Sequence, residues 1–138
     1  MIKPYKGKFH TEWYEKVAST EFAENDLTYI DTNGYLTPAV DGTLFKPAGL
    51  IQKVIASTDS DYASTTKVPV LVGNAEAEYL CEVGTGTAAT TDIGEWVDID
   101  DATSVDVTAS TYDVFFVTDI IATDSVVAKL GVKSGAAA

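Results

Sequence analysis

The feature that most constrains this sequence is a succession of short β-prone segments, each ended by turn-forming residues, that runs from Leu27 to Leu130. No convincing helical pattern follows residue 20. Strands at this spacing predict an antiparallel barrel or sandwich. Turn-forming residues such as Asp41-Gly42 separate the segments, which are residues 27–31, 35–37, 49–56, 67–72, 75–83, 96–99, 104–108, 113–121 and 125–130.

Three of these segments carry more detailed predictions. Asn33-Gly34 tolerates positive φ angles, which predicts a two-residue turn between the strands on either side of it. Pro69 cannot donate a backbone hydrogen bond, so the segment that contains it is predicted to be an edge strand or the start of a strand. Residues 75–83 alternate between apolar and acidic side chains, as a half-buried strand does.

The first twenty residues differ in composition from the rest and predict a separate N-terminal arm. Four of the nine basic residues lie here, together with four aromatic side chains. Phe9 to Val17 is compatible with two helical turns or with an extended strand. We therefore expect an all-β chain in which an extended or partly helical arm (residues 1–20) precedes a small antiparallel β-barrel or sandwich (residues 21–130), followed by a flexible tail (residues 131–138).

Charge and hydropathy exclude several classes of protein. The formal net charge is −12, and every basic residue is a lysine. Without arginine, and with this excess of acidic groups, nucleic-acid binding is not expected. The apolar runs are far shorter than the ~20 residues that cross a bilayer, so no membrane association is expected. The first residues contain no apolar leader pattern, which predicts synthesis and retention in a cytoplasm.

The residues that most often carry enzyme chemistry are scarce or isolated. Cys81 is the sole cysteine and lies in a strand-like segment, where we expect an inert buried thiol. His10 is the sole histidine and lies in the predicted arm, where we expect a solvated or interface side chain. We therefore predict a protein that is not an enzyme and holds no cofactor.

Acidic clusters near residues 59–61 and 98–101 raise the alternative of calcium binding. Asp59 and Asp61 form the first cluster, and the second consists of Asp98, Asp100 and Asp101. Neither cluster matches a twelve-residue calcium loop with its central glycine and terminal glutamate. A solvated acidic face is the favoured interpretation of both, and no metal site is predicted.

The order of several short motifs resembles that of the small β-barrel decoration proteins on the heads of tailed bacteriophages. The motifs are Gly34-Tyr35-Leu36 with Pro38-Ala39, Gly49-Leu50-Ile51, Val68-Pro69-Val70, Ala77-Glu78-Tyr79-Leu80 and Ile93-Gly94-Glu95-Trp96-Val97-Asp98. The resemblance covers about residues 27–130. It implies a structural virion protein, made in the host cytoplasm, that binds the outside of an assembled capsid and stabilises contacts between subunits. The implied partners are the major capsid protein and further copies of the chain, with a trimer favoured.

Within this interpretation, the predicted arm supplies the contact to the capsid. The candidate contact residues are Tyr5, Lys6, Lys8, Phe9, Trp13 and Tyr14. Two alternatives remain open. The aromatic side chains of the arm can instead fold back on their own barrel. The chain can also be a carbohydrate-binding or other surface-attachment module of a virion, in which Trp96, Tyr112 and Tyr79 would stack on sugar rings, although Tyr79 is better explained as a core residue.

Overall fold

The chain folds into two β-sheets joined by a bent ribbon, as seen in a computed structural model that describes residues 1–40 and 47–131. Among these described residues, the only helical element is the 3-10 turn η1 (Thr90–Asp92). The prediction of an all-β chain is therefore confirmed. None of the described segments is a helix long and apolar enough to cross a lipid bilayer. The predicted turn at Asp41-Gly42 and the predicted tail beyond Gly131 lie outside the described residues.

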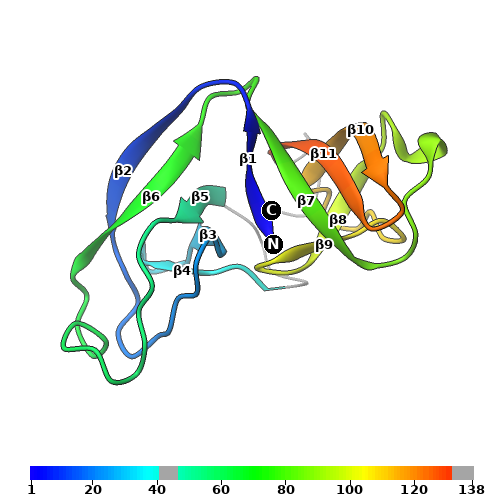
Figure 1. Cartoon of the computed structure of the whole chain (residues 1–138). Helices are drawn as coiled ribbons and strands as arrows, with labels where there is room; N and C mark the ends of the chain where they lie inside the picture. The colour runs from blue at the N-terminus through cyan, green and yellow to red at the C-terminus, as the bar shows by residue number, and fades with distance from the viewer. Residues whose placement is uncertain (41–46, 132–138) are drawn as a thin grey trace.

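The first sheet closes into a five-stranded barrel with one extra strand (Figure 1). Around the ring the strands are β7 (Glu78–Thr85), β11 (Ser125–Leu130), β10 (Phe115–Ala122), β8 (Trp96–Asp101) and β9 (Ser104–Asp106). Pairing of β9 with β7 completes the ring, and this pair is parallel while the others are antiparallel. The predicted barrel is therefore confirmed, but it is mixed and not purely antiparallel.

The second sheet has five strands and curls toward closure. In spatial order they are β2 (Phe9–Glu15), β6 (Lys67–Gly73), β5 (Pro47–Ile51), β3 (Leu27–Ile30) and β4 (Leu36–Pro38). Just after β2, the backbone N–H of Val17 donates to the carbonyl of Leu36, so the two ends of the sheet meet at this point. At Gly49 a Cβ atom would lie 2.2 Å from the carbonyl oxygen of Leu71, so only glycine lets β5 and β6 approach this closely.

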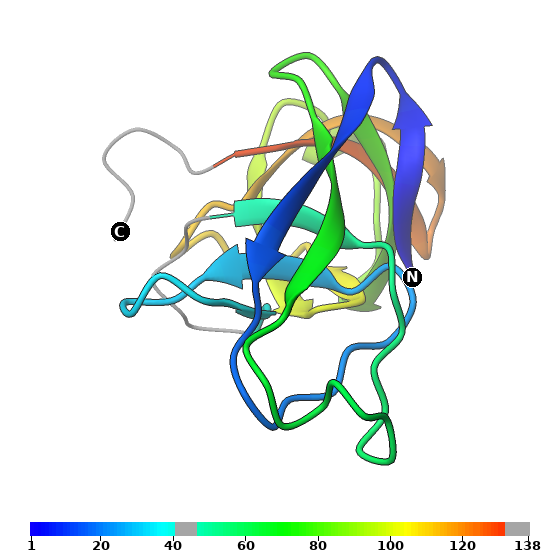
Figure 2. The same ribbon diagram turned by 90° about the vertical axis from the view of Figure 1, so that its left-hand side faces the viewer.

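The predicted N-terminal arm is not supported, because residues 1–20 contribute a strand to each sheet. β1 (Ile2–Lys6) pairs with β7 of the barrel, and β2 pairs with β6 along its whole length. The two pairs form one continuous ribbon that bends where the chain passes from one sheet to the other (Figures 1 and 2). Of the two conformations considered for Phe9 to Val17, the extended one is observed from Phe9 to Glu15.

The bend of this ribbon depends on Gly7. Its φ angle is +102°, and a Cβ atom there would lie 2.9 Å from Cα of Ala77 in the connection between β6 and β7. The connection from β1 to β2 and the connection from β6 to β7 therefore turn side by side. There the N–H of Asn74 donates to the carbonyl of Lys8. Composition marked residues 1–20 as distinct, but pairing partners far along the chain incorporate them into the fold.

Two apolar clusters fill the molecule, one on each face of the second sheet. The barrel interior, with Phe115, Val117 and Val126, continues onto Leu27 and Leu50 of the second sheet. The opposite face of that sheet buries a smaller cluster, which includes Phe22, Leu36, Ile51, Val68 and Val70. Because successive side chains of a strand point to opposite faces, neighbours such as Leu50 and Ile51 serve different clusters.

Two local predictions need correction. β6 is not an edge strand, because β2 flanks it on one side and β5 on the other. Pro69 is accommodated where pairing with β5 ends, since its carbonyl accepts the N–H of Gln52 just beyond that strand. The hairpin between β3 and β4 is confirmed, but its loop spans residues 31–35, and in it Gly34, unlike Asn33, has a positive φ angle.

Candidate functional site

Four of the six predicted contact residues lie at the surface of the bent ribbon. The side chain of Trp13 is 60% exposed and that of Tyr5 is 50% exposed. Lys6 and Lys8 are exposed beside the bend. These four residues and exposed Lys3 are called the ribbon surface below.

The other two predicted contact residues fold back on the protein. Phe9 is partly buried and meets Tyr79 edge to face, with ring centroids 5.4 Å apart. Tyr14 is partly buried against the apolar cluster of the second sheet. Phe9 and Tyr14 therefore follow the alternative in which the aromatic side chains fold back on the protein, whereas Tyr5 and Trp13 are exposed.

Trp13 lies at the open margin of a sheet face that is otherwise covered. It sits opposite Pro69 on β6, and its neighbour Thr11 sits opposite Leu71, which in turn pairs with buried Leu50. Along this face the side chains therefore pass from the core to the surface as the sheet extends to β2. A large aromatic ring on such a margin offers contact area at little conformational cost, because tryptophan has only two rotatable side-chain bonds.

The ribbon surface includes a cluster of lysines at the start of the chain. Residues 1–8 contain three lysines and no acidic side chain, in a chain whose formal net charge is −12. The α-amino group of Met1 forms an ion pair with Glu82, so the three lysines supply the exposed cationic groups. Carboxylates of the paired strand lie near them, since Lys6 is opposite Glu78 across β1 and β7, so the lysines offer individual contacts to carboxylates of a partner.

The residues considered for enzyme chemistry have structural or solvent-exposed settings. Cys81 is fully buried on β7, and burial raises the pKa of its thiol far above the ordinary value. Both facts agree with the predicted inert thiol. His10 is exposed on β2, with its Nε2 atom 3.0 Å from a carboxylate oxygen of Glu12. Within residues 1–40 and 47–131, no three His, Cys, Asp or Glu side chains lie close enough together to hold a metal ion.

Asp98 corrects the interpretation of residues 98–101 as a solvated acidic face. Its side chain is buried, and its carboxylate accepts the backbone N–H groups of Thr111, Tyr112 and Asp113 at 2.8–3.1 Å. It therefore fastens the loop that leads into β10. A carboxylate that accepts several backbone hydrogen bonds is a structural anchor, and the sequence alone does not reveal the loop that it binds.

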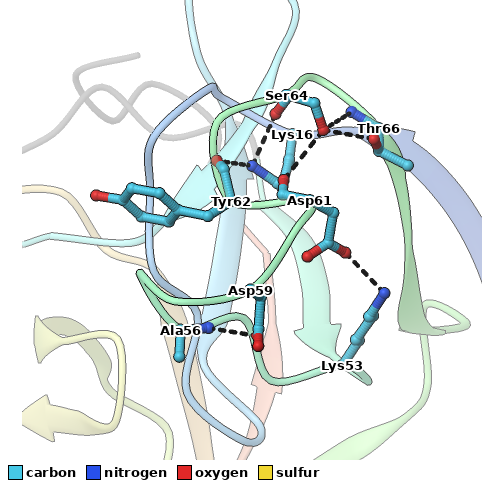
Figure 3. Close-up of polar contacts among 8 residues, drawn as sticks. All are labelled: Lys16, Lys53, Ala56, Asp59, Asp61, Tyr62, Ser64 and Thr66. Atoms are coloured by element: carbon cyan, nitrogen blue, oxygen red, sulfur yellow. Dashed lines mark hydrogen bonds and ion pairs between the residues drawn. The ribbon is translucent and has the colours of Figure 1, made fainter.

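A second buried polar group, Lys16, was not identified from the sequence. Its side chain is fully buried just after β2, and its amine donates hydrogen bonds to three backbone carbonyls (Figure 3). The oxygen atoms belong to Val17, Tyr62 and Ser64, at 3.2, 2.7 and 2.8 Å. Burial lowers the pKa of the amine, and the nearby charge of Asp61 opposes this shift.

The loop that Lys16 holds is polar and internally bonded. Asp61 accepts a hydrogen bond from the amine of Lys53 at 2.7 Å, and this contact is the main reason why the pKa of Asp61 is lowered. Asp59 accepts the N–H of Ala56, and Ser64 contacts Thr66 through their hydroxyl groups (Figure 3). The hollow beside them is lined by polar side chains, whereas ligand sites are mostly apolar, so we interpret the cluster as a loop anchor.

The three aromatic residues considered for sugar binding do not share one exposed surface. Tyr79 is buried between Phe9 and Phe115, which confirms its expected core role. Trp96 is partly buried and packs against Phe116, with ring centroids 5.4 Å apart, and Tyr112 packs against the barrel core.

Comparison of the chain with protein-family models, with curated proteins and with solved structures found no match. The sequence and the geometry described above are therefore the basis for the function proposed next.

Proposed function

We propose that this protein is a non-catalytic structural component of a phage particle, which binds the outer surface of the assembled capsid and stabilises contacts between capsid subunits. The ribbon surface makes the contact. The observation that carries the proposal is the exposure of Tyr5 and Trp13 on the two strands of the bent ribbon, whose first eight residues carry three lysines in an otherwise acidic chain.

Aromatic anchors and charge have separate roles in this proposal. Exposed Trp and Tyr side chains are the residues that most often dominate binding energy at protein interfaces. The lysines of residues 1–8 orient the acidic body away from a capsid surface that presents carboxylates. Because a capsid repeats the same site many times, modest affinity at each site gives a large stabilisation of the shell, as for any ligand that binds only the assembled state.

The test uses particles from the phage that encodes the chain, stripped of it by mild denaturant and then mixed with purified wild-type or variant protein. Co-sedimentation measures binding. We expect wild-type protein to rebind and to raise the temperature at which the heads release DNA. Trp13→Ala and Tyr5→Ala should each weaken binding about tenfold or more, as the loss of an aromatic anchor does.

The matched control is Ile93→Ala, which removes an exposed apolar side chain from a turn of the barrel domain, away from the ribbon. It should bind like wild type. Deleting residues 1–20 would not serve as a test, because it removes β1 and β2 from both sheets. The proposal fails if purified particles never carry the chain, or if Trp13→Ala and Tyr5→Ala bind as tightly as the control.

A further inference from the structure

β2 presents an outer edge whose backbone hydrogen-bonding groups have no partner among the described residues. The N–H of Lys16 donates to the carbonyl of Thr66, so the backbone groups of even-numbered residues in this stretch point to β6. Those of Phe9, Thr11 and Trp13 therefore point to the opposite side. The donation from Val17 to Leu36, on that outer side, confirms this alternation.

The other two strands that end a sheet, β1 and β4, have blocked edges, and this contrast sets β2 apart. Next to β1, the carbonyl of Met1 accepts the N–H of Glu82, so the backbone groups of Ile2 and Pro4 point away from β7. Pro4 has no N–H to donate along this edge. On β4, the outer carbonyl of Leu36 is already bonded to Val17, and the strand ends at Pro38. Of the described strands that end a sheet, β1, β2 and β4, only β2 has an unoccupied edge without proline.

We propose that β2 pairs antiparallel with β2 of a second copy of this chain, around a two-fold axis at Thr11. In this register Thr11 faces its own counterpart, and Phe9 faces Trp13 twice. All the outward N–H and C=O groups of these three residues then find partners in the other copy. The two second sheets merge into one continuous sheet across the axis.

Side-chain charge and the free length of the edge favour this register over those with the axis at Glu12 or at Trp13. With the axis at Thr11, His10 of each copy faces Glu12 of the other, and both residues are exposed. Within each chain the Nε2 atom of His10 also lies 3.0 Å from a carboxylate oxygen of Glu12, so the four side chains gather in one cluster across the axis. A shift that places the axis at Glu12 sets two glutamates opposite each other, which is unfavourable. With the axis at Trp13, Thr11 of each copy would have to pair with Glu15 of the other. The bridge between Lys16 and Leu36 already closes the sheet beside Glu15.

This pairing and the capsid proposal share Trp13, which faces Phe9 of the other copy in the dimer. They are tested separately, because dimerisation depends on the backbone edge of β2 and is measured without capsids. The net charge of −12 on each copy opposes association at long range. Salt near 0.15 M screens that repulsion beyond ~8 Å, so the measurement is made at or above this ionic strength.

Sedimentation velocity of the full chain, from micromolar to submillimolar concentration, tests the proposal. We expect a concentration-dependent dimer, with slowed amide hydrogen exchange at Phe9, Thr11 and Trp13 in the dimer. His10→Glu places like charges opposite each other at two symmetric positions and should weaken dimerisation about tenfold. The double variant His10→Glu/Glu12→His again places a histidine opposite each glutamate and should recover dimerisation.

Two further variants test the backbone edge. Thr11→Pro removes an outward N–H that makes no bond to β6, and it should abolish the dimer while circular dichroism stays native. Thr11→Val keeps the N–H and should leave the dimer intact. If Thr11→Pro does not fold, the charge-swap pair decides the question. A monomer at all concentrations, a trimer, or dimerisation that is unaffected by His10→Glu would overturn the proposal.

Discussion

Replacing Lys16 with methionine should destabilise the protein by about 2–4 kcal/mol. Methionine keeps an unbranched stem of similar length in the buried site but has no donor for the carbonyls of Val17, Tyr62 and Ser64. Each hydrogen bond from a charged donor contributes about 1.5–3 kcal/mol, so the gross loss is roughly 4–9 kcal/mol. The desolvation cost of the ammonium, several kcal/mol, is recovered on substitution. The net effect is therefore smaller than the sum of the three bonds.

Urea unfolding followed by tryptophan fluorescence measures this change. With a slope of about 2 kcal/mol per molar urea, the midpoint should fall by roughly 1–2 M. The matched control is Lys67→Met, since Lys67 is exposed at the start of β6. It should change stability by no more than about 0.5 kcal/mol. Limited proteolysis should cut Lys16→Met first within residues 57–66, which the amine fastens in the wild type.

The pH dependence gives a second measurement of the same group. Because burial lowers the pKa of Lys16 below its ordinary value of 10.5, the unfolded chain binds more protons between the two values. The free energy of unfolding of wild type, relative to Lys16→Met, should therefore rise with pH over that interval and level off above 10.5. A midpoint for Lys16→Met equal to or above that of wild type, with the loop equally protected, would refute the role assigned to this amine.

Two further predictions concern other buried polar groups. Asp98→Ala should destabilise the protein by about 2–4 kcal/mol, because three backbone donors lose their acceptor. The stability of Asp98→Asn should fall between that of Asp98→Ala and that of wild type, because one oxygen atom remains. Equal urea midpoints for the three proteins would contradict the anchoring role. Cys81 should resist a thiol reagent at pH 8 in the native protein and react fully in urea, because the thiol is buried with a raised pKa; rapid labelling of folded protein would show that β7 opens readily.

The unusual composition of residues 1–20 was visible in the sequence because it is a local signal. Composition alone singled out residues 1–20 as unusual, and Trp13 and Tyr5 are indeed exposed. Composition could not tell these two from Phe9 and Tyr14, because the alternation of β2 directs side chains to faces whose covering depends on distant strands. Lys16 and Asp98 are ordinary charged residues in the sequence, and their partners lie 13 or more residues away, apart from Val17.

The sequence was enough to predict that the chain is β-rich, roughly where the strands β3 to β11 lie, and that residues 33–34 belong to a hairpin loop. These properties follow from alternation and from turn residues within a few positions, so short stretches suffice to specify them. The tertiary structure alone decided that β9 closes the barrel onto β7 in parallel, that β6 is interior, and that residues 1–20 join both sheets. Strand pairing uses backbone groups that every residue shares, so only the packing of the whole chain selects which strands become neighbours.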